Sequence, residues 1–114
     1  MNFALSSNLY QKMSKTLAQL SQDCQDLDSQ FTNKWNIETR LVNLMEEVGE
    51  LSHDVLVVEG KKNDALKAQD MGSNLTNLLY EILLIADKYN VNMDESWEEF
   101  IKVMPQWVEM RNKK

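Results

Sequence analysis

Three glutamates lie within five residues of an otherwise apolar segment of this chain. Glu47 and Glu50 are three residues apart and Glu46 and Glu50 are four apart, so on a helix they share one face. Like charges at this spacing repel each other by a few tenths of a kcal/mol per pair on an exposed helix. A hard divalent cation such as Mg²⁺, which prefers oxygen ligands, would compensate for this repulsion. The segment therefore predicts a magnesium site, with a solvated acidic helix face as the alternative.

Two polar stripes border the apolar faces of two expected helices, each within an arc of roughly 60°. The stripe on the earlier helix consists of Asn43, Glu47, Glu50 and Asp54. The stripe on the later helix consists of Asp70, Asn74, Asn77 and Glu81. If these helices pack antiparallel, we expect the stripes to face each other and form a pocket of oxygen ligands. The alternative for Asn74 and Asn77 is that their amides bond to each other or to the backbone.

The apolar spacing that positions these stripes is helical almost throughout, and glycine and proline are too scarce for the turns of a sheet. We therefore expect an all-α, four-helix bundle that forms a single domain over residues 1–114. The third helix is apolar around most of its circumference, which indicates a subunit interface in addition to a core. The expected helices run from about Leu5 to Ser29, from an N-cap at Asn36 to about Glu59, from about Ser73 to Tyr89, and from a cap at Asp94 to Pro105, which ends or kinks the last one. The segment 63–72 is either a loop or a short helical turn.

Composition excludes several classes of protein. A net charge of -6 argues against non-specific binding to nucleic acid or to acidic membranes, because both attract basic surfaces. The single cysteine, Cys24, excludes an intramolecular disulfide and a cysteine-based zinc site. The first 20 residues are too polar for a signal peptide, and no apolar run reaches membrane-spanning length. We expect a soluble protein of the cytoplasm.

The segment from Trp35 to Val55, with the Glu-Glu-Val-Gly-Glu-Leu run at its centre, resembles the MazG-like, all-α nucleoside triphosphate pyrophosphohydrolases. Their signature is E-E-x-x-E, a spacer of one to three dozen residues, and then E-x-x-D on the next long helix. The turn after that helix is similar to Ile85–Ser96 here, and the resemblance covers about Trp35 to Phe100. Counting back from Ala86 places the E-x-x-D positions on Asn74 and Asn77.

The resemblance implies hydrolysis of a nucleoside triphosphate to a monophosphate and pyrophosphate, with Mg²⁺ as cofactor and Mn²⁺ as the alternative cation. It implies that Glu47 and Glu50 are metal ligands, and that Glu46 is either a ligand or the group that orients a water. Asn74 and Asn77 would occupy metal-ligand positions without supplying charge. The alternatives are a weakened enzyme, an enzyme in which Asp70 or Glu81 replaces the missing acids, and a relative that binds nucleotides or assembles without catalysis.

The resemblance also implies substrate-binding residues and partners. Trp35 corresponds to an aromatic residue that often stacks on the base, with a core cap as the equal alternative. Lys34 is a candidate phosphate contact, although a solvated loop lysine is the commoner case. His53 either joins the site or is exposed. Family members assemble as dimers or tetramers, so we expect a homo-oligomer; base and sugar preference stay open.

Overall fold

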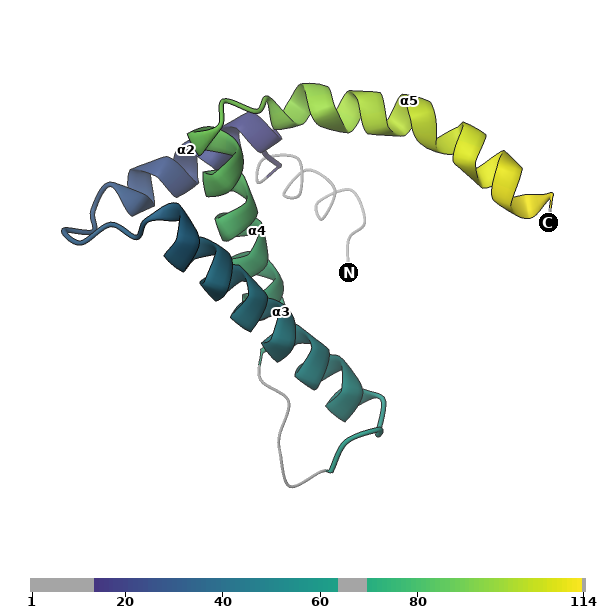
Figure 1. Ribbon diagram of the computed structural model, residues 1–114, viewed down its shortest axis with the longest axis horizontal. Helices are drawn as coiled ribbons and strands as arrows, with labels where there is room; N and C mark the ends of the chain where they lie inside the picture. Colours follow the sequence, from purple (N-terminus) through teal and green to yellow (C-terminus); the bar gives the residue numbers. More distant parts are fainter. Residues whose placement is uncertain (1–13, 64–69, 114) are drawn as a thin grey trace, which may run out of the picture.

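The computed structural model describes residues 14–63 and 70–113, and every regular element in this part of the chain is helical. Four α-helices follow one another: α2 (Leu17–Asp28), α3 (Ile37–Val58), α4 (Met71–Lys88) and α5 (Met93–Asn112) (Figure 1). This confirms the all-α prediction for the described residues. None of the helices found there is long and apolar enough to cross a membrane.

The small core lies on α4, which contacts both α2 and α3. Its buried apolar residues are Leu83, Leu84 and Ala86, all in the second half of α4. Helices α3 and α4 end in the same backbone conformation. Gly60 and Asn90 adopt left-handed backbone, and the amides of the following Lys61 and Val91 bond back to the carbonyls of Leu56 and Ala86. These are Schellman motifs, which reverse the chain and complete the backbone hydrogen bonds of the last turn.

The predicted helix from Leu5 to Ser29 is wrong in its continuity. Residues 14–16 are not helical, and α2 begins at Leu17 with Thr16 as its N-cap. The Thr16 hydroxyl accepts a bond from the Gln19 amide at 3.1 Å, and the Gln19 side chain accepts one from the Thr16 amide at 2.8 Å. This reciprocal capping box fixes a helix start that apolar periodicity does not reveal. The earlier part of the prediction, up to residue 13, lies outside the described residues.

The predicted starts of the last two helices also shift. Asp70 accepts a bond from the Ser73 amide and caps α4, which begins at Met71 rather than Ser73. Asn92, not Asp94, caps α5. Pro105 does not end α5, which continues to Asn112. Proline removes only its own amide from the helical ladder, so the helix loses the hydrogen bond to the Ile101 carbonyl while the residues on either side keep helical backbone. Of the ambiguous segment 63–72, residues 64–69 lie outside the described part.

Helix α5 leaves the other three helices and extends alone (Figure 1). None of its residues is buried. Its first turn docks on α2, where the Asp94 carboxylate accepts bonds from the amides of Leu17 and Ala18, both at 3.1 Å. The radius of gyration is 18.0 Å, against about 13 Å for a compact domain of this length. The chain alone is therefore an open structure.

Candidate functional site

The two polar stripes face each other across α3 and α4, as the sequence predicts for antiparallel packing. Three side-chain hydrogen bonds join the two stripes, from Asn43 to Glu81 at 3.3 Å, from Asn77 to Glu47 at 3.5 Å, and from Asn74 to Asp54 at 2.7 Å. Residue numbers rise along α3 as they fall along α4, which is the antiparallel order. In each pair an asparagine amide donates to a carboxylate.

The innermost pair is Asn74 and Asp54. Asn74 is 3% exposed and Asp54 is 0% exposed. The alternative, in which the amides of Asn74 and Asn77 bond to each other or to the backbone, is not what the structure shows, since both amides donate to carboxylates of α3. His53 is half-buried, with Nδ1 3.4 Å from Asp54 Oδ1, so it adjoins the stripe rather than facing solvent freely.

The three glutamates of the Glu-Glu-Val-Gly-Glu-Leu run differ in exposure. Glu46 and Glu50 are exposed and Glu47 is half-buried against α4. Glu46 and Glu50 line an open pocket of about 420 Å³ that reaches the buried end of the stripe, and its other lining residues are Gly49, His53 and Asp54. The site thus combines one carboxylate held by an amide with two that are accessible.

The fit of Mg²⁺ to this site depends on how many ligands the chain must supply. Among the described residues, no three Asp, Glu, His or Cys side chains converge closely enough to form a metal cage. Mg²⁺ rarely needs one, since it is commonly held by one or two carboxylates together with substrate phosphates and waters. Glu47 and Glu50 fit that pattern, and Asn77 lies beside Glu47. Asn74 fits less well, because its amide is bonded to Asp54.

The two acids considered as replacements for the missing ligands have other partners. Asp70 caps α4. Glu81 is 3% exposed, and its two oxygens accept bonds from Arg40 at 3.0 Å and from Asn43. Arg40 also reaches Asp28 on α2 at 3.3 Å. This cluster ties α2, α3 and α4 together. One guanidinium pairs with two carboxylates, so each acid has a cationic partner although the cluster keeps an excess of negative charge.

An aromatic pocket of about 150 Å³ opens next to the Arg40 cluster. Its walls are Asp28, Phe31, Asn33, Lys34, Trp35, Arg40, Tyr80 and Glu81. The sequence pointed to Trp35 and Lys34, and the structure places both in this one pocket. The sequence analysis did not identify three other pocket residues, Phe31, Arg40 and Tyr80, because they come from three different segments of the chain. The stripe that ends at Glu81 was the one sequence feature that pointed to this part of α4. Burial, followed by the nearby Asp28 carboxylate, raises the pKa of the Tyr80 phenol, so Tyr80 is a neutral wall of the pocket.

Arg40, which lines the pocket, and Glu47 lie on the same side of α3, and Glu50 lies about 80° further round the helix from Arg40. Arg40 and Glu47 are seven residues apart, which is two helical turns, or about 10 Å along the axis. A ligand with a flat ring in the pocket and a charged chain running along α3 would therefore meet Glu47 and Glu50.

Comparisons with protein-family models, curated proteins and solved structures found no match to this chain.

Proposed function

We propose that the protein is a Mg²⁺-dependent nucleoside triphosphate pyrophosphohydrolase of the MazG-like type, which removes surplus or non-canonical nucleotides in the cytoplasm. The observation that carries the proposal is that Glu47 lies two helical turns from Arg40 on the same side of α3, that Arg40 lines the aromatic pocket, and that Glu50 follows about one turn further along. In a nucleotide the base is followed by the sugar and then by the phosphates. Along α3 the aromatic pocket, which suits a base, is followed by the glutamates, which suit a cation bound to phosphates.

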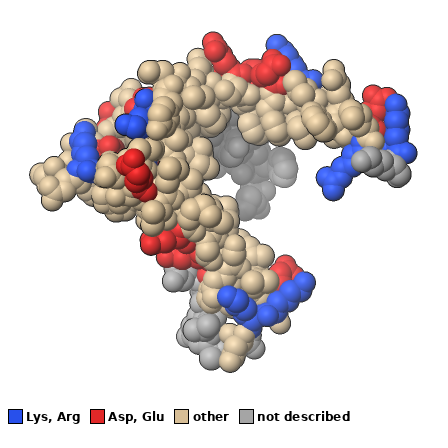
Figure 2. Space-filling model, viewed as in Figure 1, with Lys and Arg blue, Asp and Glu red and all other residues tan. Residues whose placement is uncertain are grey.

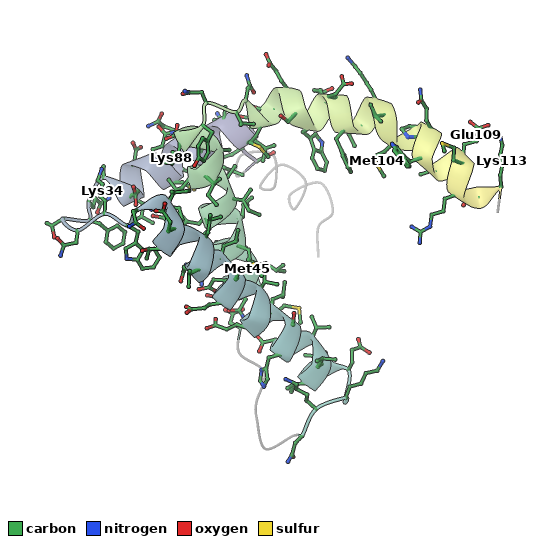
Figure 3. The ribbon with its side chains drawn as sticks, in the orientation of Figure 1. Lys34, Met45, Lys88, Met104, Glu109 and Lys113 are labelled. Carbon is green, nitrogen blue, oxygen red and sulfur yellow. The ribbon has the colours of Figure 1, made fainter. Side chains whose placement is uncertain are left out.

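In this proposal the base lies against Trp35, whose side chain is half exposed at the mouth of the pocket. Lys34 lies in the α2–α3 connector, at one end of the molecule, where its ammonium can attract an anionic ligand (Figure 3). Glu47 and Glu50 would hold Mg²⁺ together with the phosphates, with Asn77 as a neutral neighbour. When bound, the cation would neutralise phosphate charge and polarise a water.

The reaction consumes one water. The water oxygen bonds to the α-phosphorus, the bond from that phosphorus to the α–β bridging oxygen breaks, and pyrophosphate leaves with the electron pair. The exposed carboxylate of Glu46 lines the same pocket as Glu50. In this proposal it would orient the water and accept its proton, or would serve as a further ligand.

A second candidate function is nucleotide binding without hydrolysis. The observation that favours it is that Asn74 and Asn77 give hydrogen bonds to Asp54 and Glu47. An amide satisfies a carboxylate without a cation, which weakens the demand for Mg²⁺ at this site. Such a protein would bind the same ligand and release no pyrophosphate.

We also propose that the protein works as a homodimer or homotetramer. Large apolar side chains are exposed on both helices of the site, including Leu41 and Met45 on α3 and Leu75 and Ile82 on α4. The chain exposes 9495 Å², which is about 3,000 Å² more than expected for a compact monomer of its mass. A standard interface removes only about 800 Å² from each partner, so the exposed surface is ample for assembly.

The decisive test is pyrophosphate release from a panel of canonical and modified nucleoside triphosphates, with Mg²⁺ and then Mn²⁺. Glu47→Gln should lower turnover at least 100-fold, whereas Glu59→Gln, an exposed glutamate at the end of the same helix, should leave it unchanged. Release unaffected by Glu47→Gln would refute the assigned site. No release by the native chain, together with nucleotide binding, would establish the second candidate, and Asn74→Glu/Asn77→Asp should then create activity.

A further inference from the structure

Helix α5 carries an apolar face that no described part of the chain covers. Seven apolar residues beyond the first turn are at least one-third exposed: Trp97, Phe100, Ile101, Val103, Trp107, Val108 and Met110. With Met104, most of them fall within an arc of about 120°, which we call the α5 stripe (Trp97, Phe100, Ile101, Met104, Trp107 and Val108). The rings of Trp97 and Phe100 stack with centroids 5.5 Å apart.

Charged side chains gather along the outer edge of α5, while its inner edge is uncharged over most of its length (Figure 2). The ion pair of Glu109 and Lys113, at 3.4 Å, falls opposite the stripe on a helical projection. A helix that docks through its first turn on the described residues, and that is apolar on one side beyond it, is stable in water only if that side is covered.

The order of residues in the stripe is symmetric about Met104, which lies midway along α5 (Figure 3). Ile101 and Trp107 lie three residues on either side of it, and Phe100 and Val108 lie four. Trp97 and Arg111 lie seven on either side, at the same angular position as Met104. Two antiparallel copies would therefore place apolar residues opposite apolar residues and each Arg111 guanidinium over a Trp97 ring, a favourable cation–π contact.

The distribution of charge along α5 favours the same orientation. The first half contains four acids, Asp94, Glu95, Glu98 and Glu99, against one cation, Lys102. The last turns contain Arg111, followed by Lys113, against one acid, Glu109. Antiparallel pairing brings each acidic half beside the basic end of the other copy, whereas parallel pairing brings like charges together. It also puts the two chains' remaining helices at opposite ends of a helix about 30 Å long, where they do not compete for space.

We propose that α5 pairs antiparallel with α5 of a second copy of this chain, about a two-fold axis at Met104. A sequence that is complementary to itself in this way is the property of an isologous interface, in which the same patch serves both subunits. This pairing is one contact of the homo-oligomer proposed above. It rests on the proposal of assembly alone and does not require nucleotide binding. Assembly through α3 and α4 could persist without it.

Disulfide trapping tests the register and the orientation, in a Cys24→Ala background that removes the native thiol. Met104→Cys should form a covalent dimer under mild oxidation, because the two residues meet at the axis. Phe100→Cys and Val108→Cys should each cross-link poorly alone and efficiently when mixed. Efficient cross-linking of each variant with itself would overturn the antiparallel orientation, and failure of Met104→Cys would overturn the register.

Association in solution is the second measurement, by analytical ultracentrifugation without nucleotide. Met104→Asp should weaken association at least 100-fold, and Arg111→Glu should weaken it at least 10-fold. Lys102→Glu makes the same charge change as Arg111→Glu on the outer side of α5 and should leave association unchanged. Circular dichroism checks that each variant keeps its helices. A monomeric native chain, or a dimer indifferent to Met104→Asp, would overturn the proposal, whatever the outcome of the pyrophosphate assay.

Discussion

The side-chain amide of Asn74 donates a 2.7 Å hydrogen bond to the carboxylate of Asp54, and both side chains are buried between α3 and α4. Asn74 occupies the position where the resemblance places a glutamate. A second carboxylate there would lie against Asp54 and repel it, whereas the amide stabilises it. The asparagine is thus part of the packing of the helix pair as well as a changed ligand position.

Replacing Asn74 should therefore cost stability. Asn74→Ala removes a donor from a buried carboxylate, and we expect the free energy of unfolding to fall by about 1–3 kcal/mol. Asn77→Ala is the matched control, because Asn77 is exposed and its contact with Glu47 is 3.5 Å long; its effect should stay within about 0.5 kcal/mol. Urea unfolding measures both. Equal effects would contradict the importance of the buried bond.

Arg40 should be the most sensitive charged residue of the fold. Arg40→Met leaves the buried Glu81 carboxylate without its guanidinium and releases Asp28 on α2. Breaking such a pair from one side costs about 3–5 kcal/mol, so the variant should be strongly destabilised in chemical unfolding. Lys113→Met removes an exposed partner of Glu109 and should change stability by less than about 1 kcal/mol. Adding Glu81→Leu to Arg40→Met should recover part of the loss.

Asp94 caps the start of α2 from the first turn of α5. Asp94→Ala removes the acceptor for the amides of Leu17 and Ala18, and a lost cap costs about 0.5–2 kcal/mol. Hydrogen exchange at these two amides should accelerate in the variant. Glu95→Ala, the exposed neighbour in the same turn, should leave their exchange unchanged. Unaltered protection in Asp94→Ala would show that α5 does not hold α2 in solution.

Trp35 should determine affinity for ligands that contain a base. Stacking on an aromatic side chain contributes about 1–3 kcal/mol per base, so Trp35→Ala should weaken nucleotide binding about 5- to 150-fold by calorimetry. Inorganic triphosphate, which has no base, should bind the variant and the native chain equally. Tyr89→Ala, which removes an exposed aromatic ring at the end of α4, serves as the control and should leave nucleotide affinity unchanged. Loss of triphosphate binding in Trp35→Ala would assign Trp35 a structural role.

We expect the free energy of unfolding to fall in strong alkali as the Tyr80 phenol loses its proton. Because burial, followed by Asp28, raises the pKa of its phenol in the folded chain, the unfolded chain loses that proton first. The contribution of Tyr80 to stability is fully present below the ordinary tyrosine pKa of about 10, and it is lost as pH rises through the folded value. Absorbance titration should show one late phenol, and Tyr80→Phe should remove it. A phenol titrating at or below the ordinary value would contradict the burial.

The sequence by itself determined the helices and the two stripes, because both depend on spacing along one helix. Periods of three and four residues set the side on which Glu47 and Asp54 lie, and the facing of Asn43 with Glu81 follows once the two helices pack antiparallel. Helix ends were less accessible, since the start at Leu17 is set by a local bond between Thr16 and Gln19 that competes with periodicity.

Only the tertiary structure decided the partners that come from distant segments. Arg40 meets Asp28 and Glu81, Tyr80 joins Trp35 in one pocket, and Asp94 caps α2 across 77 residues of chain. The uncovered stripe of α5 likewise became visible only when no described helix was found to pack on it. Such contacts depend on how helices cross in space, and crossing is set by the shapes of all the packed side chains together rather than by the spacing of any one segment.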